Sequence, residues 1–135
     1  MNGAGPIVER FFALQRRMYT GGPVEPLESL LADDVTWHVP GRSAIAGDYV
    51  GRRAVMEYFR RRRALTGATL EIVDRGGIAV DDTVVRLGDG RATIAGEQVS
   101  WRTAGVYRVE GGRLREAWLV PLDPEQFELA WARAR

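Results

Sequence analysis

The sequence predicts an α+β fold in which helices pack on the concave face of a curved, mostly antiparallel sheet. Before Gly67, apolar residues recur at the three- and four-residue spacing of amphipathic helices. After Gly67, they alternate with polar residues or cluster as β-branched side chains, which is typical of strands. Helices followed by a run of strands, and not interleaved with them, indicate helices gathered on one side of an antiparallel sheet.

Three helical segments are expected before Gly67. The first spans residues 7–19 and ends at the Gly-Gly-Pro sequence of residues 21–23, which cannot continue a helix. A short second segment spans residues 25–31, and a third spans residues 52–65. Residues 123–126, Asp-Pro-Glu-Gln, have the order of an N-cap, a first-turn proline and a capping-box glutamine, so they begin a short final helix.

The strands are recognised by alternating or β-branched residues between turn sequences. Their expected ranges are 35–39, 69–73, 78–80, 83–94, 98–109 and 114–120. Pro40 and Gly41 end the first strand, and residues 42–50 are expected to form a loop. Gly76 and Gly77 predict a bulge that bends the strand in which they lie.

These elements are expected to form one domain, residues 1–135, since the chain has no repeats, linkers or low-complexity segments. One face of the sheet has no helix to cover it, yet residues 83–87 and 105–109 carry apolar side chains on both sides. An exposed apolar sheet face usually marks a protein interface, so a two-fold homodimer is expected.

Composition excludes several kinds of chemistry. The chain has no cysteine and no lysine, which removes thiol nucleophiles, Schiff bases and the lysine of phosphate-binding loops. The single histidine, His38, argues against a zinc or iron site, because such sites usually recruit several imidazoles. No glycine-rich dinucleotide motif follows a strand. Neither a metal nor an organic cofactor is therefore expected.

The charge pattern predicts no nucleic-acid or membrane partner. The formal net charge is +1, and no apolar run approaches the ~18–20 residues that span a bilayer. The opening residues lack the features of a signal peptide, so a cytoplasmic location is expected. The run Arg60–Arg63 sweeps nearly the full circumference of a helix, so at least one of these side chains must lie along apolar surface.

Two residues are candidate proton carriers. His38 has an ordinary pKa near ~6.5, which suits a general base, but strict strand alternation places it on the opposite face from Trp37 and Val39. Glu116 lies among apolar neighbours on its strand, where desolvation would raise its pKa. The alternatives are a histidine that ties down the following loop and a glutamate that pairs with an arginine across a dimer interface, and both remain open.

Other residues are candidates for binding a ligand. Gln15 is a polar residue within an apolar helix stripe, so its amide needs a partner, either a ligand or the core backbone; Tyr19, one turn further, has the same two interpretations. Trp101, Thr103 and Gly105 share one strand face, where the two small residues would leave a void beside a stacking wall. Ordinary sheet packing is the alternative for these three.

Three segments carry a resemblance to a known family. They are ADDVTWHVPG at residues 32–41, the Tyr-Val-Gly-Arg sequence of residues 49–52, and GVYRVEGGRLREAWLVP at residues 105–121. With them the chain resembles the NTF2-like superfamily, and in particular its SnoaL-like branch of polyketide cyclase-like and ketosteroid isomerase-like proteins. The resemblance implies a cone-shaped α+β barrel with one deep pocket.

The resemblance also implies a small, largely apolar ligand and cofactor-independent acid–base chemistry of cyclase, isomerase or hydrolase type. A non-catalytic ligand-binding or assembly module of the same fold is the alternative. The residues assigned to the site are the proton carriers His38 and Glu116, the hydrogen-bonding residues Gln15, Tyr19 and Tyr49, the small residue Thr103 and the aromatic walls Trp37, Trp101 and Trp118.

The chain departs from its better-known relatives at their functional positions. The proton-shuttling aspartate, the oxyanion-binding tyrosine and the neutral acid of ketosteroid isomerase register on Val39, Gln15 and Gly105. The histidine and aspartate of SnoaL-type cyclases register on Gly105 and Leu119. Steroid isomerisation by the isomerase mechanism is therefore not expected, and the sequence does not name a substrate.

Overall fold

The computed structural model describes residues 3–134. Its helical segments are α1 (Ala4–Tyr19), a short 3₁₀ helix η1 (Glu25–Leu30), α2 (Arg52–Leu65) and α3 (Pro124–Trp131). Its strands are β1 (Leu31–Val39), β2 (Gly47–Val50), β3 (Glu71–Val80), β4 (Thr83–Ile94), β5 (Glu97–Glu110) and β6 (Arg113–Pro121).

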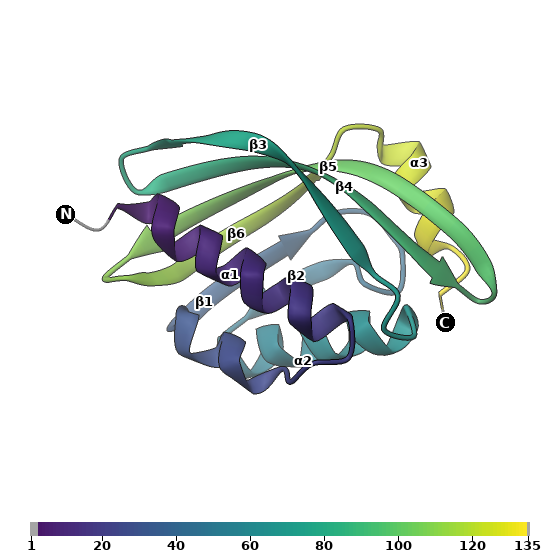
Figure 1. Cartoon of the computed structure of the whole chain (residues 1–135), viewed down its shortest axis with the longest axis horizontal. Helices are drawn as coiled ribbons and strands as arrows, with labels where there is room; N and C mark the ends of the chain where they lie inside the picture. The colour runs from purple at the N-terminus through teal and green to yellow at the C-terminus, as the bar shows by residue number, and fades with distance from the viewer. Residues whose placement is uncertain (1–2, 135) are drawn as a thin grey trace.

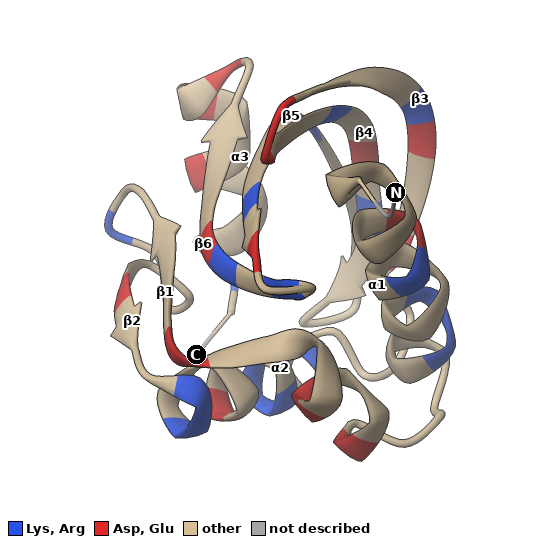
Figure 2. Cartoon of the chain, turned by 90° about the vertical axis from the view of Figure 1, so that its left-hand side faces the viewer, with Lys and Arg blue, Asp and Glu red and all other residues tan. Residues whose placement is uncertain are grey.

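The strands form one sheet in the order β2-β1-β6-β5-β4-β3, which curves strongly without closing (Figure 1). Every neighbouring pair is antiparallel except β1 and β6, which are parallel. Figure 2 shows the sheet curling around the side on which α1 and α2 lie. The predicted α+β class, with helices on the concave face of a mostly antiparallel sheet, is confirmed.

The core lies between the concave face and the helices. The ring of Phe11 on α1 lies 6.0 Å from that of Phe59 on α2, and Phe59 meets Trp37 of β1 edge-on at 5.2 Å. At the other end, Trp131 of α3 packs 5.2 Å from Trp101 of β5. All five side chains are buried, so aromatic contacts join the three α-helices to the sheet.

The Tyr-Val-Gly-Arg sequence of residues 49–52 joins β2 to α2, and its glycine and arginine both bond to β1. Gly51 has φ +92°, which a side chain would strain, and its N–H donates to the carbonyl of Val35 at 2.7 Å. Arg52 then forms an ion pair with Asp33 and donates to the carbonyl of Leu31 at 3.2 Å. These bonds fix the start of α2 against β1.

Two predicted boundaries were wrong. Residues 47–50 form β2 instead of part of a loop, because Tyr49 pairs across from Trp37 and extends the sheet at its edge. Strand β1 begins at Leu31 and not at Val35. The prediction missed this start because the exposed Asp33 and Asp34 interrupt the apolar alternation there.

Other local predictions were confirmed. The pairing of β3 with β4 shifts register between Asp74 and Gly77, where the bulge was expected. The Asp123 side chain accepts a hydrogen bond from the Gln126 N–H at 3.1 Å and caps α3. Charged positions of both signs are interspersed over the elements (Figure 2). Among residues 3–134, no helix is long and apolar enough to cross a membrane.

Candidate functional site

A narrow cavity lies on the concave face, lined by α1, α2, β1 and the strands β3 to β6. Its volume is about 30 Å³, room for roughly two water molecules. Its apolar and aromatic lining includes Phe12, Trp37, Ile72, Trp101, Tyr107 and Leu119. Its polar lining consists of Gln15, Arg62, Asp74, Arg86 and Thr103. Polar groups thus converge on an otherwise aromatic chamber, which is the usual character of a small-molecule site.

Two lining glycines shape the chamber. A Cβ atom on Gly90 would overlap the Trp101 ring, and one on Gly105 would overlap the Tyr107 ring. The expectation that Thr103 and Gly105 leave a void for a ligand therefore needs correction, because the ring of Tyr107 fills much of that space. A larger ligand requires one of these two rings to move.

Five of the predicted ligand-binding residues line the cavity: Gln15, Trp37, Trp101, Thr103 and Trp118. The Gln15 side chain is buried, yet among residues 3–134 its amide has no hydrogen-bond partner. The Thr103 hydroxyl donates only a long bond, 3.4 Å, to the carbonyl of Gly88. These polar groups retain hydrogen-bonding capacity that a ligand would use.

The two predicted tyrosines differ. Tyr19 is buried beside Gln15 in a smaller hollow next to the cavity, where its hydroxyl accepts from Arg62 at 3.4 Å. Burial raises the Tyr19 pKa, which Arg62 partly offsets, so the hydroxyl is neutral at physiological pH. The Tyr49 hydroxyl instead donates to the carbonyl of Ile45 at 2.6 Å and ties down the loop before β2. Tyr49 is not among the cavity-lining residues.

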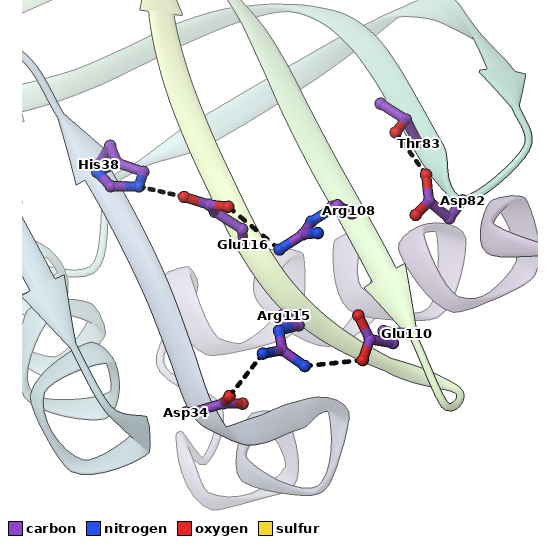
Figure 3. Close-up of polar contacts among 8 residues, drawn as sticks. All are labelled: Asp34, His38, Asp82, Thr83, Arg108, Glu110, Arg115 and Glu116. Carbon is purple, nitrogen blue, oxygen red and sulfur yellow. Dashed lines mark hydrogen bonds and ion pairs between the residues drawn. The ribbon is translucent and has the colours of Figure 1, made fainter.

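His38 and Glu116 meet on the opposite, convex face of the sheet. His38 Nε2 lies 2.8 Å from Glu116, which also accepts from Arg108 at 3.3 Å (Figure 3). The His38 Nδ1 lies 2.7 Å from Asp48. Partial burial lowers the His38 pKa, but the bonds to Asp48 and Glu116 outweigh this and raise it above its usual value. We call His38, Asp48, Arg108 and Glu116 the convex cluster.

Strand alternation explains this placement. Trp37 points into the core, so its neighbour His38 points outward, and Pro40-Gly41 does not redirect it. Trp118, opposite His38 on β6, stacks on the imidazole with ring centroids 5.5 Å apart, although it also borders the cavity. The position of His38 and Glu116 gives no support to their predicted catalytic role. His38 binds Asp48 in the segment that follows it, as its structural alternative described. Glu116 pairs with Arg108 of its own chain, whereas its alternative expected an arginine across a dimer interface.

Arg62 lines the cavity but was not predicted from the sequence as a site residue. The residue is only 5% exposed. It follows Tyr58 and Phe59 at four- and three-residue spacing and Val55 at seven, so it shares the buried face of α2. That spacing could have identified which arginine of the 60–63 run lies against apolar surface.

Asp74 and Arg86 were also missed. They form an ion pair at the cavity, and the Asp74 carboxylate further accepts from the Gly76 N–H at 2.9 Å. Burial works to raise the Asp74 pKa, but these hydrogen bonds outweigh it and lower the pKa below its ordinary value. Asp74 lies two residues after the inward-facing Ile72, and Arg86 lies two residues before the inward-facing Gly88, so both share the inward face of their strands. This could be predicted only once the strand pairing is known.

Within residues 3–134, no group of three or more histidine, aspartate or glutamate side chains is arranged to hold a metal ion. The cavity's ionisable groups are one carboxylate, two guanidiniums and the Tyr107 hydroxyl. This set can exchange a proton at Asp74 and bind negative charge at the arginines.

A curved sheet with helices across its concave face and one aromatic cavity defines a small, cone-shaped α+β container. Residues 8–117 match the family model of the SnoaL-like domain, so the chain belongs to the SnoaL-like family. An uncharacterized protein of Mycobacterium tuberculosis, Rv0034, is 29% identical over 127 residues, covering 93% of this chain and 94% of its own.

Solved structures show the same fold. Bal32a, from a soil-derived mobile gene cassette, matches with a TM-score of 0.84 and 27% identity, over 96% of this chain and 99% of its own. An NTF2-like protein of Anabaena variabilis matches with a TM-score of 0.80 and 16% identity, over 89% of this chain and 90% of its own. The predicted NTF2-like, SnoaL-like assignment is confirmed.

Proposed function

We propose that this protein binds a small, largely apolar molecule in the concave cavity and performs acid–base chemistry on it. The observation that carries the proposal is the convergence of one carboxylate and two guanidiniums on a chamber with aromatic walls. Aromatic walls bury the body of a ligand, and a few placed polar groups orient it. The chemistry is of cyclase, isomerase or hydrolase type, since each of these needs only proton transfer and charge stabilisation.

Asp74 is the proton acceptor in this proposal. It is the one carboxylate among the lining residues, and its lowered pKa keeps it ionised at neutral pH. Arg62 and Arg86 face the same chamber and stabilise negative charge that develops on the ligand. Asp74 therefore replaces His38 and Glu116 as the candidate base.

Non-catalytic binding is the second candidate, and one observation favours it. Asp74 is held by Arg86 and by the Gly76 N–H, and a carboxylate whose pKa is lowered in this way is a weak base. In that case the same cavity holds a ligand without changing it.

Binding is tested with benzamide, a flat and neutral probe, titrated into the protein by NMR. The Thr103→Phe variant fills the cavity and should abolish saturable binding. The matched control is Arg102→Phe, on the neighbouring residue of the same strand but facing away from the cavity. Equal binding by Thr103→Phe and wild type would show that the cavity is not the site.

Proton transfer is tested by the rate at which deuterium from the solvent enters 2-indanone, a ketone with acidic α-hydrogens. Asp74→Asn should slow the protein-catalysed rate by about 10²-fold or more. Asp81→Asn, in an exposed turn, is the control. No acceleration by the wild-type protein, or an Asp74→Asn variant as active as wild type, would favour the non-catalytic candidate.

A further inference from the structure

Arg62 is a buried cation for which the described part of the chain provides no carboxylate. It takes part in none of the ion pairs within residues 3–134, although the residue is only 5% exposed. Its one side-chain hydrogen bond there is the long contact from Nη1 to the Tyr19 hydroxyl, 3.4 Å, and its buried Nε–H has no acceptor. Such a group is unusual, because buried charges are normally paired.

Aromatic rings surround the guanidinium and account for part of its stability. Its central carbon lies 5.4 Å from the ring centre of Tyr19, 5.9 Å from that of Tyr58 and 5.8 Å from that of Trp131. Cation–π contacts of this kind stabilise the charge, but a guanidinium has five N–H donors. Most of these donors are left without an acceptor oxygen among residues 3–134.

The other charges at the cavity do not compensate Arg62. Asp74, the one lining carboxylate, is already paired with Arg86. The lining therefore carries one positive charge in excess, and Arg62 is its most deeply buried ionic group. The unpartnered amide of Gln15 faces the same cavity and offers a further donor.

From this arrangement we infer that the ligand of the cavity is a small aromatic carboxylate, whose anionic group Arg62 binds. The planar fork of a guanidinium matches a carboxylate with two parallel hydrogen bonds. A carboxylate also takes about the room of the two waters that the cavity holds. The aromatic body then lies against Phe12 and Trp37 in space that the ring of Trp101 or Tyr107 must vacate. This inference rests on the proposed function, of which it names the ligand class.

The test compares benzoate with benzamide, which has the same shape and no charge, on wild type, Arg62→Met and Arg60→Met. Arg60 lies on the same helix but is exposed, so its variant controls for net charge. Wild type and Arg60→Met should bind benzoate at least tenfold more tightly than benzamide. Arg62→Met should lose that preference and keep its affinity for benzamide.

Thermal melting by circular dichroism checks that Arg62→Met folds; if it does not, the preference of the wild-type protein decides by itself. Equal affinity of wild type for the two probes, or an Arg62→Met variant that still prefers benzoate, would overturn the carboxylate inference. The proposed function survives that result as long as Thr103→Phe abolishes benzamide binding. If neither probe binds to any of these proteins, both the inference and the proposed cavity site fail.

Discussion

The concave cavity and the convex cluster lie on opposite faces of one sheet and contain similar groups in different states. In the convex cluster, Glu116 pairs with both His38 and Arg108 (Figure 3). The other nitrogen of His38 faces the Asp48 carboxylate. In the cavity, Arg62 is more deeply buried than His38, yet within residues 3–134 it has no carboxylate. The groups of the convex cluster have partners from the protein itself, and we assign them to stabilising the fold.

The difference teaches how to separate structural from functional charge in this molecule. In the convex cluster, both imidazole nitrogens and Glu116 already have partners within the protein, so a ligand would have to displace them, and among residues 3–134 only the Arg108 Nε–H there is buried without an acceptor. In the cavity, the buried Nε–H of Arg62 has no acceptor from the same residues and the Gln15 side chain lies in the lining, so a ligand would complete their hydrogen bonds. We therefore place the binding site on the concave face, and the predictions below test that separation.

The largest effect, a loss of stability, is expected from replacing Trp37, whose neighbour His38 points to the opposite face of the sheet. Trp37→Ala removes a buried indole that packs on Phe11 and Phe59, and should reduce the free energy of unfolding by about 3–5 kcal/mol. His38→Ala should cost far less, since Asp48 and the imidazole are in contact with solvent. Urea denaturation measures both values. Equal losses for the two variants would contradict the assignment of faces.

A second prediction concerns the rest of the convex face, for which we propose a two-fold homodimer. Leu87, Ala104 and Val120 are register partners across three strands, and Leu87 and Val120 are 43% and 42% exposed. An apolar row of this kind favours an interface. Leu87→Arg should weaken dimerisation by at least about tenfold, measured by sedimentation at several concentrations.

The control for the dimer is Leu129→Arg, at an exposed leucine on α3 and away from the sheet. It should leave sedimentation unchanged. Wild-type protein that sediments as a 15.0 kDa monomer at micromolar concentration would refute the homodimer.

The smallest effect is the pH dependence of the convex cluster. Because the folded-state pKa of His38 is raised above 6.5, its contribution to stability is fully present below 6.5 and is lost as the pH rises through the folded-state value. The stability difference between wild type and His38→Ala should therefore be greater near pH 5.5 than near pH 9, and should stay below about 1 kcal/mol. Urea denaturation at both pH values measures it. A difference that grows with pH would mean that His38 is not held as a cation.

The fold could be predicted from the sequence because helical spacing and strand alternation are both visible among residues that are close together in the chain. The alternation of Trp37 and His38 even anticipated that His38 points away from the core. The cavity could not be predicted in the same way. Asp74 and Arg86 come together only through the register of β3 with β4, and the Gly76-Gly77 bulge shifts that register. Sequence spacing does not determine where a bulge leaves the side chains beyond it.

Arg62 shows a second limit. Its spacing from Tyr58 and Phe59 indicates which arginine of the run is buried, but spacing along one helix does not show that the guanidinium reaches a cavity lined by the sheet. Tyr107 was likewise read as part of a strand, while its ring occupies space above Gly105 that the sequence suggested was empty. A glycine gives no sign of which neighbour fills the space it leaves.

The most direct test of the concave site is chemical-shift mapping of benzoate on the ¹⁵N-labelled protein. Saturable shifts should be confined to the backbone amides of the cavity strands, in particular Gly88, Gly90 and Thr103, and should be absent from Asp48 and Glu116. Shifts that gather around His38, Asp48 and Glu116 while the cavity amides stay unchanged would place the site on the convex face and contradict the account.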